Sequence, residues 1–145
     1  MTMPRPNSES GMTVVEVIFA LMLITLLSVT YYVLVESYKE RRMSEKAAKA
    51  LMFAAREQED YFAKEHRYFD AEVSASDGEV YLSTPGGTKT SVVVPPRVSL
   101  VMKAVGPDKK AFEGFAFFTG SKKVHQYHSK SGKMTSAERA KDDSE

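Results

Sequence analysis

The sequence predicts an α+β protein in which one long N-terminal helix packs on a small antiparallel β-sheet, with the first half of the helix spanning a membrane. Two observations support this fold class. No Gly or Pro occurs between Met12 and Asp77, and the apolar residues of this stretch are spaced as in a helix. After Asp77 the chain changes to short β-rich segments separated by turn residues, which is typical of antiparallel strands.

The composition excludes several classes of function. The chain has 145 residues, enough for one small domain, and it contains no cysteine. Disulfide scaffolds, cysteine-ligated metal sites and thiol nucleophiles are therefore excluded. The 20 Lys and Arg residues nearly balance the 19 Asp and Glu residues, which leaves a net charge of +1. This balance also excludes a uniformly basic protein that packages nucleic acid.

The first half of the predicted helix is apolar on every side. Val17 to Val35 is a run of 19 residues without a charge, Gly or Pro. A helix of that length spans about 28 Å, close to the roughly 30 Å of a bilayer core. A cleavable secretory signal has a shorter apolar core, of about 7–15 residues, and ends in a small-residue site. No Ala-x-Ala sequence directly follows Val35, so we expect the run to be retained as an anchor.

Glu16 is the ionisable residue at the start of this run, directly before Val17. A carboxylate inside a membrane is unfavourable, so such a residue is a candidate functional group. Two interpretations follow from the residues alone. Glu16 marks the membrane edge, where the positive end of the helix dipole favours it, or it is a functional group inside the membrane.

The residues around Glu16 form a specific pattern. A short polar leader ends at Gly11, the hydrophobic Met12 follows, and Glu16 is the fifth residue after the glycine. Over residues 11–35 this pattern resembles the class III signal of type IV pilins and of the pseudopilins of type II secretion. The chain departs from the family in having Met12 where Phe is most frequent, and in lacking the proline that many type IV pilins carry midway through the run.

The resemblance implies a role for three residues. A prepilin peptidase would cut between Gly11 and Met12, and Met12 would become the N-methylated first residue. Glu16 would assist assembly by pairing with the N-terminal amine of a neighbouring subunit. The resemblance also implies a pilin-like fold, with a head domain in which the long helix packs on the sheet.

The second half of the helix carries a stripe of small and apolar residues at three- and four-residue steps, with charged residues between them. We expect this stripe to be core, covered by the sheet: Met43, Ala47, Ala50, Leu51, Ala54, Ala55, Tyr61 and Phe62. Strands are predicted from alternation and turn residues at 80–82, 91–94, 98–105, 111–119 and 124–128.

The sequence thus divides into five segments. They are a cleaved leader (1–11), a transmembrane and filament-core helix (12–35), an amphipathic helix of the head (36–67), an antiparallel head (68–133) and a loose polar tail (134–145).

Basic residues concentrate in the predicted head. Residues 80–133 contain nine Lys and Arg but two acids, a local charge of +7. The candidate anion-binding residues lie on turns: Lys109, Lys110, Lys122, Lys123 and Lys130. One interpretation is that they are solvated hairpin tips that keep strand edges from aggregating. The other is a head that binds an anionic ligand such as DNA, an acidic polysaccharide or an acidic neighbour.

No catalytic or metal site is predicted. His125 and His128 are three residues apart on a predicted strand, so they face opposite sides and cannot easily share a metal. The acidic tail residues Asp142 and Asp143 lack the surrounding ligands that calcium needs. No Gly-rich phosphate loop or nucleophile elbow is present either. We therefore expect a protein that is not an enzyme and needs no cofactor.

The function expected from the resemblance is that of a structural subunit of a type IV pilus-like filament. Its partners would be other copies or related subunits, a prepilin peptidase and an inner-membrane assembly platform. The precursor would lie in the bacterial inner membrane with its leader cytoplasmic and its head periplasmic, and the filament would be periplasmic or on the cell surface.

Two alternatives remain open. The first is a pseudopilin of type II secretion. The second is an anchored protein that does not polymerise and whose basic head binds an anion. The charges near the apolar run bear on its orientation, because Lys39, Arg41 and Arg42 follow it, and the positive-inside rule alone would place this flank in the cytoplasm.

Overall fold

The computed structural model describes residues 13–139, which form one helix and seven strands. In chain order these are α1 (Val14–Glu65), β1 (Ala71–Val73), β2 (Val80–Ser83), β3 (Lys89–Val94), β4 (Val98–Val105), β5 (Ala111–Phe118), β6 (Lys123–His128) and β7 (Lys133–Glu138). The predicted α+β class, a long N-terminal helix and a small antiparallel sheet, is confirmed. The chain divides into two compact units, with the boundary between Ser37 and Tyr38.

Helix α1 ends at a left-handed residue. His66 has a φ of 57°, and its backbone N–H donates to the carbonyl oxygen of Phe62 at 2.8 Å. This is the common way to close a helix, because the turned residue satisfies a carbonyl that the helix leaves open. The helix therefore stops at Glu65, two residues before the predicted boundary at residue 67.

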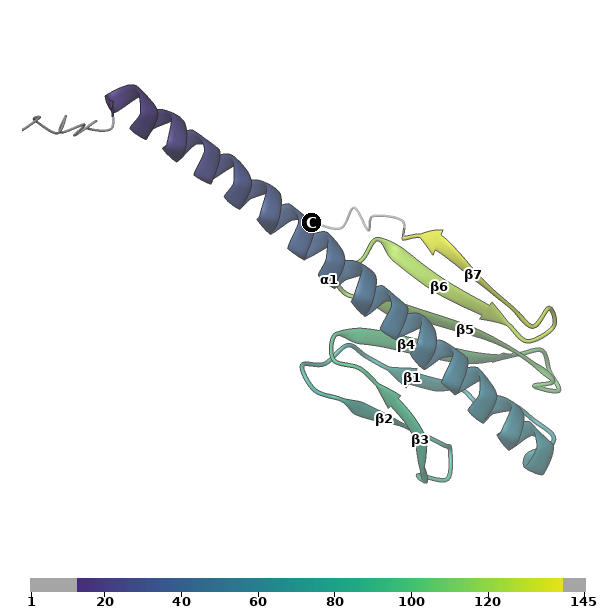
Figure 1. The fold of residues 1–145 in the computed structure, drawn as a ribbon. Helices are drawn as coiled ribbons and strands as arrows, with labels where there is room; N and C mark the ends of the chain where they lie inside the picture. Colours follow the sequence, from purple (N-terminus) through teal and green to yellow (C-terminus); the bar gives the residue numbers. More distant parts are fainter. Residues whose placement is uncertain (1–12, 140–145) are drawn as a thin grey trace, which may run out of the picture. The chain divides into compact units, whose positions relative to one another are not determined.

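The head contains two separate sheets (Figure 1). The larger has the strand order β1-β4-β5-β6-β7, and the smaller is the hairpin β2-β3. All pairs are antiparallel, and β4 to β7 follow one another as a meander. The predicted strands at 98–105, 111–119 and 124–128 are part of it, whereas those predicted at 80–82 and 91–94 form the separate hairpin. Strand β1 joins the far edge by pairing with β4, with Val73 opposite Leu100. The second part of α1 crosses one face of the larger sheet.

The core lies between this part of α1 and the larger sheet. The central part of the predicted stripe is buried, since Ala47, Leu51 and Ala54 each have 0% of their surface exposed. The residues at its ends, Met43, Tyr61 and Phe62, are half-buried against this core. From the sheet, Leu100 and Phe112 are the central buried partners. Helix and sheet approach closely at Gly114, where an added Cβ would lie 2.7 Å from Leu51 Cδ1. The small helix residues are therefore needed to seat α1 on the sheet.

Two parts of the head differ from the sequence-based expectation. The sequence predicts a loose tail from residue 134, but residues 133–138 form strand β7, which pairs with β6 along its whole length. Strand β1 was not predicted. Both lie at edges of the larger sheet, where polar and charged residues are tolerated because one side of the strand faces solvent.

Candidate functional site

The first turn of α1 places Glu16 in a reciprocal pair with Thr13. The Thr13 backbone N–H donates to Glu16 Oε2 at 2.8 Å, and the Glu16 backbone N–H donates to Thr13 Oγ1 at 3.3 Å. This is a capping box, in which two side chains satisfy backbone donors that a helix start leaves open. Sequence analysis singled out Glu16 but missed Thr13, although the spacing of a Thr and a Glu three residues apart is the known signal.

Gly11 and Met12, the predicted cleavage and methylation residues, lie outside the described residues. The helix starts at Val14, and its first helical hydrogen bond runs from the Val17 N–H to the Thr13 carbonyl at 3.1 Å. Glu16 therefore lies three residues after Thr13, the first residue that the structure describes.

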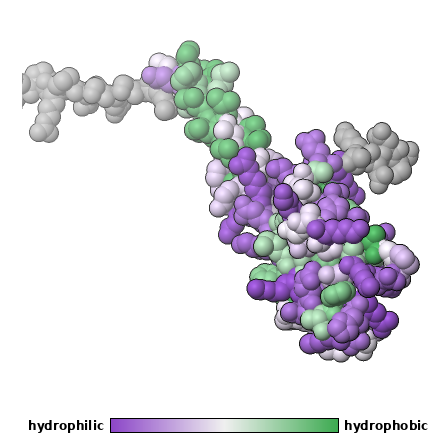
Figure 2. All heavy atoms as spheres, turned by 90° about the vertical axis from the view of Figure 1, so that its right-hand side faces the viewer, coloured by the Kyte–Doolittle hydropathy of each residue, from purple (hydrophilic) through white to green (hydrophobic). Residues whose placement is uncertain are grey.

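The apolar segment after Glu16 is exposed. An 18-residue window of α1 near its N-terminus is long and apolar enough to cross a membrane, and 0% of it is buried within the protein. Large apolar residues are exposed here: Phe19 has 63% of its surface exposed and Leu27 has 66%. Figure 2 shows these N-terminal turns as a continuous apolar surface. A continuous exposed apolar segment of this kind is typical of a surface that contacts lipid or another apolar surface.

The few hydroxyl groups of this segment are satisfied inside the helix. Thr25 Oγ1 donates to the Leu21 carbonyl at 2.8 Å, and Ser28 Oγ donates to the Ile24 carbonyl at 2.7 Å. Thr30 Oγ1 does the same to the Leu26 carbonyl at 2.9 Å. Because a polar group without a partner is unfavourable in lipid, these bonds let the segment enter an apolar environment. The long apolar helix is thus compatible with membrane anchoring.

The five candidate anion-binding lysines are not brought together. Lys109 and Lys110 lie on the β4–β5 turn, and Lys130 lies on the β6–β7 turn at the same end of the sheet. Lys122 and Lys123 lie at the β5–β6 turn, at the opposite end. An eight-residue strand separates the two ends by about 25 Å. The five lysines therefore form two groups, one at each end of the larger sheet.

Two of these lysines have acidic neighbours. Lys109 Nζ lies 3.3 Å from Asp70 Oδ2, and Lys110 Nζ lies 3.8 Å from Asp108 Oδ2. Asp70 also accepts a hydrogen bond from the Ala104 backbone N–H at 2.8 Å. That bond, followed by the contact with Lys109, lowers the pKa of Asp70 below its ordinary value. Lys109 is therefore held at a fixed position, whereas Lys110 lies in an exposed pair that contributes little.

The histidines face opposite sides of the sheet, as their spacing predicts. His125 lies against α1, with Nε2 2.9 Å from Ser44 Oγ and Nδ1 2.9 Å from Ser136 Oγ. Burial lowers the pKa of His125. His128 Nδ1 lies 3.4 Å from Glu113 Oε1. Among the described residues there is no group of three or more His, Asp or Glu side chains that could hold a metal.

The Ser44–His125 pair has the atoms of a nucleophile and a base, but both side chains are buried at the contact between α1 and the sheet. The pair therefore offers no access to a substrate. It connects α1 to the edge strand β7 through Ser136.

No family model matches this chain, and neither the curated proteins nor the solved structures include a significant match. The functional assignment therefore rests on the geometry of α1 and of the head.

Proposed function

We propose that this chain is a structural subunit of a type IV pilus-like filament. In this proposal a prepilin peptidase cuts the precursor between Gly11 and Met12, and the mature chain polymerises through its N-terminal helix. The observation that carries the proposal is the exposed apolar segment of α1 with a carboxylate, Glu16, in its first turn. The role is structural, and it requires no catalytic group.

The apolar segment supports the proposal because two environments can cover it, the lipid of the membrane and the apolar helices of other subunits. Lipid covers it while the precursor is stored in the membrane. After extraction, only the apolar helices of other subunits offer a comparable surface, and each large side chain removed from water contributes about 1.5–3 kcal/mol. Stacked α1 helices would therefore form the core of a filament by side-chain packing.

Glu16 supports the proposal through its remaining hydrogen-bonding capacity. Its Oε2 accepts one bond from Thr13, whereas a carboxylate has about four acceptor positions. Cleavage after Gly11 would create a free amine on Met12. The amine of one subunit and the Glu16 carboxylate of the next would neutralise each other in an apolar environment, where an unpaired charge is strongly unfavourable.

The partners in this proposal are other copies or related subunits, the peptidase and an inner-membrane assembly platform. The leader would lie in the cytoplasm and the head in the periplasm, before the head becomes part of a periplasmic or cell-surface filament. A type II secretion pseudopilin would use the same helix and the same Glu16. It would differ in that its filament stays within the cell envelope.

The competing proposal is an anchored protein that does not polymerise. The charge after the apolar run favours it, because Lys39, Arg41 and Arg42 would be cytoplasmic under the positive-inside rule. In that case the leader would be retained, since the peptidase acts on the cytoplasmic side.

The test is to express Glu16→Gln with a prepilin peptidase and an assembly platform, and to measure processing and filament yield separately. Gln keeps an acceptor for the Thr13 N–H but removes the charge. We expect normal cleavage and at least a tenfold loss of sheared filaments. A tenfold loss corresponds to about 1.4 kcal/mol in the free energy of each contact between Glu16 and a neighbouring amine. Glu36→Gln, at the other end of the apolar run, is the matched control and should polymerise normally. Normal filament yield from Glu16→Gln would contradict the role of Glu16.

A further inference from the structure

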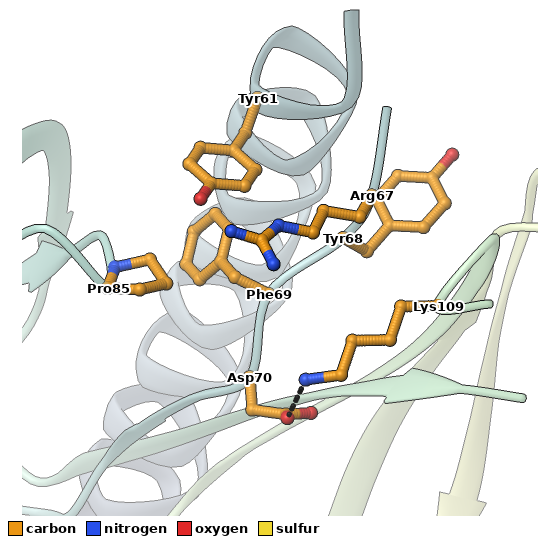
Figure 3. A pocket seen from close by; sticks show the side chains of 7 residues that line it. All are labelled: Tyr61, Arg67, Tyr68, Phe69, Asp70, Pro85 and Lys109. Atoms are coloured by element: carbon orange, nitrogen blue, oxygen red, sulfur yellow. Dashed lines mark hydrogen bonds and ion pairs between the residues drawn. The ribbon is translucent and has the colours of Figure 1, made fainter. Parts of the chain in front are cut away.

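A small cavity lies where α1 ends and the chain turns toward β1. Its volume is about 290 Å³, and its lining comes from three parts of the head. These residues are Tyr61 of α1, the following Arg67, Tyr68, Phe69 and Asp70, Pro85 of the β2–β3 turn and Lys109 of the β4–β5 turn. We call it the Arg67 cavity (Figure 3).

The walls of the Arg67 cavity are fixed by buried hydrogen bonds. Gln58, with 0% of its surface exposed, donates from Nε2 to the Phe69 carbonyl at 2.6 Å and accepts at Oε1 from the Phe69 N–H at 3.1 Å. The Tyr68 N–H donates to the Lys109 carbonyl at 2.9 Å. The backbone of Tyr68 and Phe69 is thus tied to both α1 and the β4–β5 turn, so this wall is formed before a ligand binds, and the exposed Arg67 extends from it.

The cavity carries two cations and one anion. Lys109 is paired with Asp70, but no carboxylate of residues 13–139 lies within 4.0 Å of the Arg67 guanidinium. Figure 3 shows this guanidinium lying across the cavity beside Phe69, on the side of Pro85 and of the Tyr61 hydroxyl. A guanidinium holds a carboxylate through two parallel hydrogen bonds. The net charge of +1 matches a ligand group with a single negative charge.

The remaining lining is suited to hydroxyl groups on a compact ring. Asp70 uses one oxygen for the Ala104 N–H and the other for Lys109, so acceptor positions remain for hydroxyl donors. Tyr61 adds a phenolic hydroxyl, and the rings of Tyr61 and Pro85 offer apolar surface. The volume is at the lower end for ligand pockets and corresponds to one small ring.

We propose that the Arg67 cavity binds one unit of a carboxylate-bearing sugar, with the carboxylate on Arg67 and the hydroxyl groups toward Asp70 and Tyr61. A nucleic acid fits less well, because Asp70 repels additional negative charge. Lys122 and Lys123, moreover, lie at the other end of the sheet and add no positive charge at this cavity. This proposal goes beyond that of the filament and does not depend on polymerisation.

The test is a titration of the full chain in detergent micelles with D-galacturonic acid, followed by ¹H–¹⁵N spectra that include the Arg67 side-chain Nε–H. D-galactose, which has the same ring without the carboxylate, inorganic phosphate and a short oligothymidylate are titrated in parallel. The variants are Arg67→Gln and Arg67→Lys. Lys110→Gln and Lys122→Gln are matched controls, because each removes a surface charge outside the cavity.

We expect galacturonic acid to shift the resonances of Arg67, Lys109 and Tyr61, and to bind at least tenfold more tightly than galactose. Arg67→Gln should weaken binding by at least about tenfold, and Arg67→Lys should weaken it less, because charge remains but the paired hydrogen bonds are lost. The two control variants should stay within about twofold of the wild type. Unchanged thermal unfolding of Arg67→Gln would show that its head remains folded.

Three results would overturn the proposal. One is the absence of any saturable shift at Arg67 with galacturonic acid. Another is tighter binding of phosphate or of the oligonucleotide at the same resonances, which would assign the cavity to phosphate groups. The third is an equal loss of affinity in Lys122→Gln and Arg67→Gln, which would indicate diffuse charge attraction. The filament assay has no bearing on these results, so the two proposals fail independently.

Discussion

Thr13 and Glu16 cap the start of α1 reciprocally, each side chain accepting a hydrogen bond from the backbone N–H of the other. The residue that the resemblance assigns to assembly thus also has a role within its own helix. Before assembly, the Thr13 N–H gives the carboxylate a partner in its own chain, which reduces the free-energy penalty of placing it near lipid. The cap and the proposed contact between subunits can be separated by substitution.

Thr13→Val should loosen the first turn while leaving the Glu16 charge in place. Loss of a Thr cap costs about 0.5–2 kcal/mol, so the backbone amides of Glu16 and Val17 should exchange with solvent faster, by roughly twofold to thirtyfold. Hydrogen exchange of the full chain in micelles measures this directly. Thr25→Val is the control, because its hydroxyl bonds the Leu21 carbonyl within the helix and caps no backbone N–H. Unchanged exchange at Glu16 would show that the cap contributes nothing.

Gln58→Leu should destabilise the head strongly. The substitution keeps much of the side-chain volume but leaves the N–H and the carbonyl of Phe69 without their partner in a buried place. Each buried polar group without a partner costs about 1–3 kcal/mol, so we expect a loss of about 2–5 kcal/mol in the free energy of unfolding. Denaturant unfolding measures it. Arg56→Gln, on the exposed side of the same helix, should change stability by less than about 0.5 kcal/mol; an equal effect of both would refute the role of Gln58.

Gly114→Ala should also destabilise the head, because the added methyl group would lie 2.7 Å from both Leu51 Cδ1 and Met102 Sδ. Forcing a methyl group into a packed core costs about 1–3 kcal/mol. Gly78→Ala is the matched control, since nothing lies within 4 Å of its added Cβ. The difference between the thermal midpoints of the two variants measures how tightly α1 is packed on the sheet at Gly114. Equal midpoints would mean that helix and sheet can move apart without loss.

Stability of the head should fall as the pH drops below the ordinary histidine pKa of about 6.5. Burial lowers the pKa of His125, so in this range the unfolded chain binds more protons than the folded chain. The free energy of unfolding should therefore decrease with falling pH, by less than about 1.4 kcal/mol per pH unit for one proton, and should level off above that pKa.

The measurement is a series of unfolding curves between mildly acidic and neutral pH. His125→Gln, which cannot take up a proton, should remove most of this dependence. A wild type as stable at mildly acidic pH as at neutral pH would contradict the assignment to His125.

Most of the fold could be predicted from the sequence because its elements are local patterns. The stretch without Gly or Pro predicted the long helix α1. The alternation of Val98, Leu100 and Met102 predicted β4 with its observed bounds. Strand β7 was missed because five of its six residues are exposed and it carries no alternation. The pairing of β1 with β4 was also missed, since it joins segments that are distant along the chain.

The site was only partly predictable for a related reason. A pattern of neighbouring residues identified Glu16 as a candidate, and the described helix starts at Val14, two residues after the predicted start at residue 12. The basic turns could be found from charge, but which turns share an end of the sheet depends on the order of the strands. Arg67 and Lys109 are 42 residues apart, and only the folded head brings them to one cavity.

The central claim is that the chain is processed as a pilin-like precursor, and the N-terminus of the protein extracted from membranes tests it most directly. The chain is expressed in cells with an active prepilin peptidase, extracted in detergent and analysed by intact-protein and N-terminal peptide mass spectrometry. The account predicts a chain that begins at Met12 and carries an N-methyl group. A chain that still carries residues 1–11 under these conditions would contradict it, and would favour an anchored protein that does not polymerise.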